Sequence, residues 1–286
     1  GEPVPMPMGR IRVAPVFAMQ PYQQIVGDDQ YVRALFLFGY GRLDISDIRI
    51  GDTPITEFSD IEYELREGAE GDDPVTITSI QVIEQPEQIE LVHDYGRDAE
   101  GNPDKGAGLI ETPVIRRLAS GAVRGGIVLN FPGGLYRFDV NSEENKRHTV
   151  TFRLDQREVG SVSWTEVAEL EYSAASAKPF RRQYTWALPS RGDWEIRLTR
   201  TSSSEDHSRI SRTVYLTAVQ GYRPEYPIDL ERMSAPLAMI SVKMRATYQL
   251  SGTLDQLNAL VQRYALDWDG ETWTEALTRN PASAYL

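Results

Sequence analysis

The chain has 286 residues, of which 41% are hydrophobic and 25% charged, so its length and composition allow two globular domains with a sizeable core. Its net charge of −12 argues against nucleic-acid binding, because that affinity comes mainly from cationic groups that neutralise phosphates. Cysteine is absent, which excludes disulfides, thiol catalysis and cysteine-ligated metals.

The first 30 residues are expected to be irregular, with one edge strand. Their prolines exclude a long helix; these are Pro3, Pro5, Pro7, Pro15 and Pro21. The alternation of Ile11 and Val13 with arginines predicts an edge strand that ends at Pro15. This start lacks the apolar segment of a signal peptide, and no stretch of the chain approaches the length of an apolar membrane span.

The stretch from Tyr31 to Phe58 is expected to organise the core around it. The run from Tyr31 to Phe38 is mostly apolar and β-favouring, which predicts a strand buried on both faces. Gly39-Tyr40-Gly41 then turns the chain into an alternating segment, where a slip of the period predicts a bulge near Ser46-Asp47. Together these features predict a β-hairpin packed on a core.

Strand and loop signals alternate in the next segment. Ile61, Tyr63 and Leu65 alternate with glutamates, which predicts a half-buried strand. Two further strand candidates, separated by Pro86, are residues 75–83 and 88–92. Residues 93–113 are rich in glycine and are expected to form a long flexible loop.

A series of short alternating segments from Ile127 to Tyr222 predicts a β-sandwich. In one of them, Trp194, Ile196 and Leu198 share one face of the expected strand.

The C-terminal part is expected to contain a strand and a helix. Residues 237–250 alternate in a way that predicts a strand with one apolar face. Residues 253–265 are predicted to be helical, because four apolar residues form one stripe: Leu254, Leu257, Val261 and Tyr264. Thr253 and Gln256 have the spacing of a capping box, and Asp267 to Gly270 is predicted to be a turn.

The sequence offers little support for a metal site or a common catalytic motif. The three histidines lie in separate polar segments without metal-ligand spacing, and we interpret them as surface residues: His93, His148 and His207. Asp98, Glu100, Asn102 and Asp104 alternate as in a calcium loop, but the required glycine and terminal glutamate are missing, which favours a solvated loop. The sequence contains no GxGxxG, P-loop, GxSxG or HExxH pattern.

Three further constellations each allow two interpretations. Arg191-Gly192-Asp193 matches an adhesion tripeptide, but its position after Pro189 favours a turn. Asp267 and Asp269 could be a glycosidase pair, although hairpin geometry explains them better. Five aromatic residues could form a sugar-binding platform, but their strand spacing favours core packing: Trp164, Tyr172, Tyr184, Trp186 and Trp194.

Several blocks follow one another in a fixed order: GEPVPMPMGRIRVAP, GDDQYVRALF, GYGRLDISDIRIGDTPI, FPGGL, YPIDLERMSAPLAMI and NPA. Together they resemble the hub region of the tip attachment (host-specificity) protein J family of lambda-like phage tails. The block ALPSRGDWEIRLTR resembles a strand of fibronectin type III domains, and the family carries an inserted domain of this kind after a motif like FPGGL. Because the resemblance begins at the first residue, we expect the chain to be the middle of a longer protein.

This resemblance implies a mainly β fold with two domains and one or two short helices near the C-terminus. Residues 1–126 and 223–286 would form a discontinuous tail-hub domain, and residues 127–222 an inserted fibronectin type III-like β-sandwich. We expect no catalytic residue, metal or cofactor.

The resemblance also implies a structural role in the tail tip of a phage or prophage, made in the bacterial host cytoplasm. The protein would cap the tail tube, form part of the DNA path and belong to the host-attachment assembly. Its partners would be copies of itself in a homotrimer and neighbouring tail-tip and distal tail proteins, with DNA only as passing cargo. Contact with the host cell surface would come from regions outside this chain.

The alternative is a carbohydrate- or receptor-binding module of the host-recognition apparatus. An exposed aromatic patch on the sandwich would favour this alternative, whereas buried tryptophans would favour the scaffold. A hydrolase is the weakest interpretation, because an activated nucleophile and metal motifs are missing from the sequence.

Overall fold

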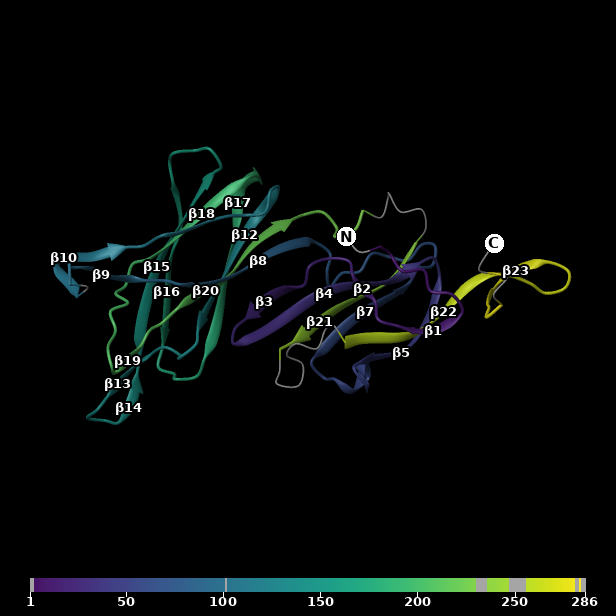
Figure 1. Cartoon of the computed structure of the whole chain (residues 1–286), viewed down its shortest axis with the longest axis horizontal. Helices are drawn as coiled ribbons and strands as arrows, with labels where there is room; N and C mark the ends of the chain where they lie inside the picture. The colour runs from purple at the N-terminus through teal and green to yellow at the C-terminus, as the bar shows by residue number, and fades with distance from the viewer. Residues whose placement is uncertain (1–2, 101, 230–235, 247–255, 281–282, 284–286) are drawn as a thin grey trace. The chain divides into compact units, whose positions relative to one another are not determined.

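The computed structural model describes residues 3–100, 102–229, 236–246, 256–280 and 283, and β-strands dominate them (Figure 1). This confirms the expected mainly β fold class. In the part of the chain described in this way, no helix has the length and hydropathy that crossing a membrane requires.

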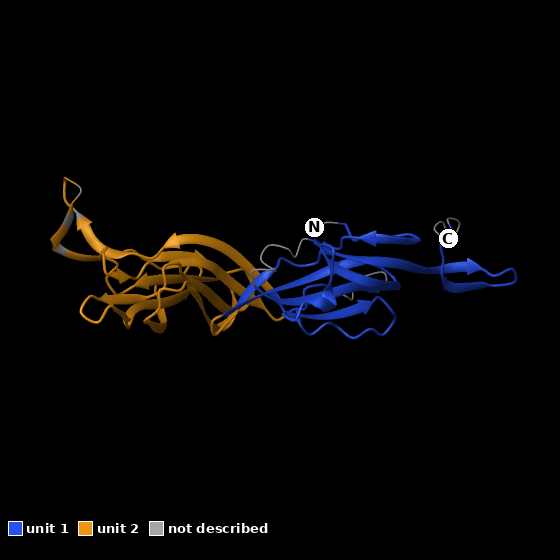
Figure 2. Cartoon of the chain, turned by 90° about the horizontal axis from the view of Figure 1, so that it is seen from below, with its two compact units in different colours: residues 1–24, 29–81, 225–286 blue, residues 25–28, 82–224 orange. Residues whose placement is uncertain are grey.

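The chain divides into two compact units (Figure 2). Unit 1 comprises residues 1–24, 29–81 and 225–286, and unit 2 comprises residues 25–28 and 82–224. The sequence placed the first domain boundary after residue 126, but unit 2 already begins at residue 82. The reason is that β8 (Gln81–Glu90) pairs with β20 (Tyr215–Arg223), and β11 (Val114–Arg117) pairs with β18 (Trp194–Arg200), so these early strands complete the sheets of unit 2.

Unit 1 consists of two β-sheets whose facing side chains form one hydrophobic core. The first sheet has the order β1-β22-β5-β6, with β23 on β22; its strands are β1 (Arg10–Val13), β22 (Leu257–Trp268), β5 (Leu43–Ile50), β6 (Thr53–Pro54) and β23 (Trp273–Leu277). The second has the order β2-β4-β21-β7, with β3 on β4; its strands are β2 (Val16–Phe17), β4 (Asp29–Tyr40), β21 (Leu237–Arg245), β7 (Ile61–Glu67) and β3 (Tyr22–Val26).

The central strand of each sheet in unit 1 comes from the segment that follows unit 2. β21 lies between β4 and β7, so that Ile240 pairs with Phe36 on one side and Leu65 on the other. β22 lies between β1 and β5, where Arg10 pairs with Gln262. Residues before and after unit 2 therefore form one folded unit.

The predicted hairpin of β4 and β5 is wrong, although β4 itself is buried as expected. Residues 34–39 are buried on both faces of the strand. β4 and β5 lie in different sheets, and the chain passes between them at Gly41, whose φ of 71° suits glycine. The reason is that β21 and β22 satisfy the edges that a hairpin would have used. A short hairpin forms one turn later, between β5 and β6.

The predicted bulge in β5 is confirmed at Asp47. The register with β22 slips between Ser46 and Arg49, and Asp47 has a φ of 47°. The Asp47 carboxylate accepts hydrogen bonds from Arg49 Nε at 2.8 Å and from Arg12. These hydrogen bonds lower the pKa of Asp47 below its ordinary value, and the hydrogen bond from Arg49 has the larger effect. Two arginines thus hold the bulge in its left-handed conformation.

β21 is buried on both faces, whereas the sequence predicted a strand with only one apolar face. Its pattern has buried residues at almost every position, including Ser241. The Ser241 hydroxyl hydrogen-bonds the buried Thr78 hydroxyl at 2.8 Å, so the loop after β7 covers the face that was expected to be solvated. A buried hydroxyl is tolerated because this partner replaces water.

The predicted helix over residues 253–265 is wrong for the residues that the structure describes, which form β22 from Leu257 onward. Residues 253–255 lie outside the described residues. Leu257, Ala259 and Val261 alternate as buried positions of a strand. Leu257 and Val261 are four apart, a spacing that fits both a helical stripe and a strand face. Pairing with β1 and β5 decides in favour of the strand.

Residues 93–111, expected to lie in a flexible loop, form a β-hairpin of β9 (His93–Arg97) and β10 (Pro103–Glu111). The Asp98 carboxylate closes its turn by accepting the backbone N–H groups of Glu100 and Asn102, at 3.1 and 2.7 Å. The glycines that suggested a loop are compatible with the strand, and one of them, Gly108, has a φ of 75° beside the register shift.

Unit 2 is a β-sandwich of two four-stranded sheets, as predicted for its larger part. One sheet has the order β11-β18-β15-β16, and its further strands are β15 (His148–Glu158) and β16 (Thr165–Ala174). The other has the order β17-β12-β20-β8, and its further strands are β17 (Phe180–Gly192) and β12 (Ala122–Phe131). A small third sheet contains β13 (Tyr136–Asp139), β14 (Glu144–Lys146) and β19 (Ile210–Ser211).

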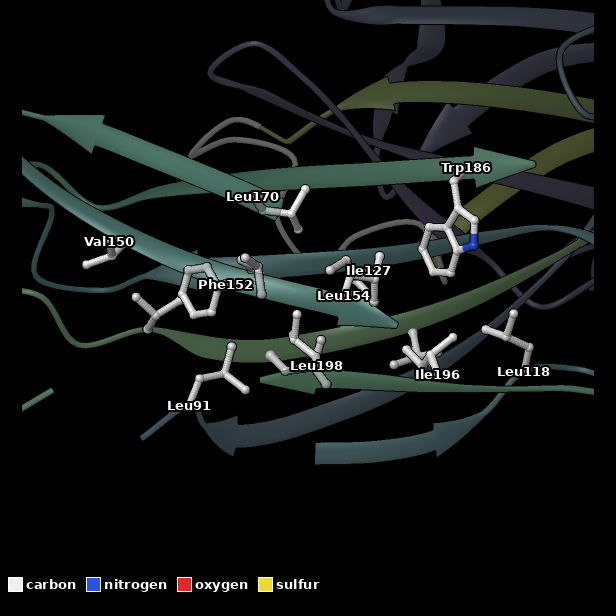
Figure 3. Close-up of a cluster of buried hydrophobic side chains, with 14 of the residues drawn as sticks. Leu91, Leu118, Ile127, Val150, Phe152, Leu154, Leu170, Trp186, Ile196 and Leu198 are labelled. Carbon is white, nitrogen blue, oxygen red and sulfur yellow. The ribbon is translucent and has the colours of Figure 1, made fainter. Parts of the chain in front are cut away.

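The core of unit 2 lies between the two four-stranded sheets (Figure 3). Ile127 of one sheet and Phe152, Leu154 and Leu198 of the other are fully or almost fully buried. β8 continues through Pro86, where the sequence predicted a break; it is the last strand of its sheet, and an edge strand tolerates proline.

Arg200 is a buried cation that holds the end of the sandwich together. Its side chain is 1% exposed, and its guanidinium donates to the carbonyl oxygens of Leu91, Ser202, Ser203 and Arg212 at 2.9–3.3 Å. Burial lowers the pKa of Arg200 to about 10, so the group remains charged at neutral pH. One side chain therefore joins the end of β8 to the loop between β18 and β20.

We expect Arg200→Met to destabilise unit 2 by about 3 kcal/mol or more, because each buried carbonyl left without a donor costs about 1–3 kcal/mol. Denaturant unfolding followed by tryptophan fluorescence measures this change. Arg209→Met, at an exposed arginine of the same loop, is the matched control and should leave the midpoint nearly unchanged. Equal midpoints for the two variants would contradict the role assigned to Arg200.

Candidate interaction surface

The histidines lie in three separate places, as expected. His93 Nδ1 lies 2.9 Å from the carbonyl oxygen of Thr201, and His207 is exposed. Burial, followed by the charge of Arg212, lowers the pKa of His148, so this ring is neutral at physiological pH. Among the residues that the structure describes, no group of three histidines or carboxylates could hold a metal ion.

The acidic residues that suggested chemistry close turns instead. Asp98 caps the β9–β10 turn, as described above. Asp269 Oδ1 accepts the backbone N–H groups of Glu271 and Thr272, both at 2.8 Å, which confirms the hairpin interpretation of this segment. The N–H of Thr272 is the main cause that lowers the pKa of Asp269, and a hydrogen bond from Thr278 does the same for Asp267. A glycosidase acid needs a raised pKa, so this pair does not fit that role.

The adhesion-like tripeptide was predicted to be a turn, but Arg191 and Gly192 are the last residues of β17, and only Asp193 lies between β17 and β18. Asp193 Oδ2 accepts a hydrogen bond from Arg117 Nη2 at 3.0 Å. The pKa of Asp193 is lowered, mainly by a hydrogen bond from Ser120. Its carboxylate is therefore engaged within unit 2, with the side chain 42% exposed.

The tryptophans of the sandwich pack into the protein instead of forming an open platform. Trp186 and Trp194 are each 8% exposed, and Trp186 Nε1 donates to Gln156 Oε1 at 2.8 Å. Burial raises the pKa of Tyr172 to about 12. Trp164 is half-buried, with the guanidinium carbons of two arginines over its ring. Core packing is thus confirmed for Trp186 and Trp194.

An exposed aromatic pair does exist, but in unit 1, on the hairpin of β22 and β23. Trp268 and Trp273 are each 50% exposed and pair across the hairpin, with ring centroids 5.4 Å apart. Leu266 and Leu277 are also exposed and lie on the same face. This surface was not predicted, because part of β22 has the apolar spacing of a helix; the alternation of Tyr264, Leu266 and Trp268 was the available signal.

The surroundings of this hairpin are acidic. Residues 264–277 contain four carboxylates and no lysine or arginine; the carboxylates belong to Asp267, Asp269, Glu271 and Glu275. At the base of the hairpin, the Arg42 guanidinium lies over the Tyr264 ring, 4.2 Å from its centroid. Such a surface repels anionic ligands and favours neutral or basic partners.

Comparison with known proteins identifies the sandwich. The fold of unit 2 is that of a fibronectin type III-like β-sandwich module inserted in a larger β protein. Residues 110–225 match the family model described as tip attachment protein J, FNIII-A domain, so this part of the chain is similar to that domain. This match confirms the predicted resemblance for the inserted fibronectin type III-like domain, and it supports a role at the tip of a phage tail in host attachment.

The other comparisons add little. The search of curated proteins finds no match to the sequence. Among solved structures, the Eiger TNF of S. frugiperda aligns with 59% of this chain and 94% of its own, at 11% identity and a TM-score of 0.24. A TM-score this low carries no argument about fold or function.

We expect the fluorescence of Trp268 and Trp273 to dominate quenching by acrylamide, because these indoles are half exposed whereas Trp186 and Trp194 are buried. The double variant Trp268→Phe/Trp273→Phe should lose most of the readily quenched emission. The matched variant Trp186→Phe/Trp194→Phe should retain it. Similar quenching constants for both variants would show that the hairpin tryptophans are covered.

Proposed function

We propose that the chain is a structural component of the tip of a phage or prophage tail, the hub that caps the tail tube and contributes to the DNA path. The single observation that carries this proposal is the FNIII-A domain of the tip attachment protein J family at residues 110–225. The discontinuous unit 1 supports it, because the hub of that family is expected on both sides of the inserted domain.

The charge of the chain agrees with a path for DNA rather than a binding site for it. A net charge of −12 repels phosphates, so passing DNA would not be retained. We further propose that the full-length protein is a homotrimer with neighbouring tail-tip and distal tail proteins as partners. Contact with the host surface would come from regions outside this chain.

We propose that this chain is a scaffold and not an enzyme, and that it needs no metal or cofactor. The engaged state of Asp98, Asp193 and Asp269 supports this proposal, because each carboxylate already accepts hydrogen bonds within the protein. Calcium and zinc should therefore leave the melting temperature of the chain unchanged. Since a specific ligand at 100 times its Kd stabilises the native state by about 2.7 kcal/mol, a rise of several degrees would contradict this prediction.

The alternative function, a carbohydrate- or receptor-binding module, now depends on a different surface. Burial of Trp186 and Trp194 argues against a sugar site on those residues of the sandwich. The exposed pair of Trp268 and Trp273 favours the alternative, because indole faces stack on neutral sugar rings. Binding of neutral oligosaccharides that depends on both tryptophans would support it.

Antibodies raised against residues 110–225 test the main proposal. On intact particles of the phage that encodes this chain, immunogold labels should gather at the end of the tail, because the domain would form part of the tip. Antibodies against a capsid protein of the same phage are the control. Labels along the tail tube or on the capsid, with the tip unlabelled, would contradict the proposal.

A further inference from the structure

The apolar surface of the β22–β23 hairpin continues the outer face of the first sheet of unit 1. Residues that pair directly across strands point to the same side of a sheet. Leu257, Ala259 and Val261 point into the core, so the intervening residues of β22 point away from it. The same alternation carries the outward face on to Trp268 at the end of β22, where Trp273 pairs with it.

The other end of this outward face is basic. Arg10 and Arg12 of β1 pair with Gln262 and Leu260, so they point to the same side as the hairpin's apolar residues. β1 is the terminal strand of its sheet, and Met8, which precedes it, is 38% exposed. Ile11 pairs with Val261 and so points to the core side of the sheet. One face therefore has exposed apolar residues with Glu275 at the hairpin end, and Arg10 at the β1 end.

We propose that these two ends bind each other between two copies of the chain, so that the hairpin of one copy docks on the β1 edge of the next. The charges are complementary: Glu275 on the apolar face and Glu271 in the turn lie at the hairpin end, against Arg10 of β1. Arg12 is already paired with Asp47 of its own copy. The contact joins two different surfaces, and such heterologous contacts repeat around a closed ring. This inference rests on the proposed hub function and names the surface through which its copies meet.

The small area of the hairpin limits the strength of this contact. Its five paired positions extend about 17 Å, so one face offers on the order of 200 Å². A stable interface needs about 800 Å² from each partner, so this contact alone gives only weak association. We therefore expect the isolated chain to be monomeric at micromolar concentration and to associate as its concentration approaches millimolar.

Sedimentation velocity at low ionic strength tests this contact through a charge exchange. Arg10→Glu and Glu271→Arg should each weaken self-association about fivefold, and the double variant should regain most of the loss, because the pair is restored with reversed charges. Glu271 suits this exchange because the turn is closed by the Asp269 carboxylate and the Glu271 backbone. Two weakened single variants without recovery in the double variant would overturn the pairing.

The apolar part of the contact has its own matched pair of variants. Trp268→Ala should weaken association about tenfold, since tryptophans often carry much of the binding energy of an interface. Val162→Ala, at a residue of unit 2 that is 89% exposed, should change nothing. Unchanged circular dichroism and melting temperature show that both variants are folded. Equal association of the two variants would overturn the docking role of the hairpin.

The absence of cysteine allows a direct test of which surfaces meet. In a mixture of Met8→Cys and Glu271→Cys chains, a short bis-maleimide reagent should join the two variants to each other. Products that join only like variants, or no association at any concentration, would overturn the inference. So would neutral oligosaccharides that bind the tryptophans of a chain that stays monomeric. Tail-tip labelling would still succeed in these cases, so failure here is distinguishable from failure of the proposed function.

Discussion

Unit 1 depends on the insertion of two late strands between early ones. β4 and β7 meet only through β21, and β1 and β5 meet only through β22. Without β21 and β22, each sheet would separate into strands with open hydrogen-bonding edges, and side chains such as Phe36 and Phe38 would lose the opposite half of their core. The pairing also explains why unit 1 tolerates an inserted sandwich: β21 and β22, which follow the insertion, complete both of its sheets.

Features that depend on local sequence could be predicted. The buried strand β4 followed from a run of apolar residues, and the bulge at Asp47 followed from one slip in alternation. Features that depend on distant partners could not. Leu257 and Val261 satisfy a helix and a strand equally, and only β1 and β5, far earlier in the chain, exclude the helix. The early domain boundary failed for the same reason, because β8 gives no local sign that it pairs with β20.

The candidate site was less predictable than the fold. Asp98 and Asp269, which were candidates for metal binding and catalysis, accept backbone N–H groups in turns. Aspartate is common in turns as well as in metal and catalytic sites, so the sequence does not distinguish these roles. Some aromatic residues are buried in the core and others are exposed, and the pairing of strands determines which. The exposed pair Trp268 and Trp273 has the same alternation as the buried Trp194, and the difference is that nothing in the described residues packs over it. The family was found through ordered blocks of sequence, not through any reactive group.

The order of strands in unit 1 has a consequence for synthesis on the ribosome. The early strands, up to Glu67, leave the ribosome long before their central partners at Leu237 and beyond. At translation rates of about 5–20 residues per second, the delay is on the order of ten seconds or more. During this time the apolar run of β4 has no β21 with which to pair. The newborn chain is therefore exposed to aggregation in this interval, and chaperones that hold extended apolar segments have their natural target at residues 34–38.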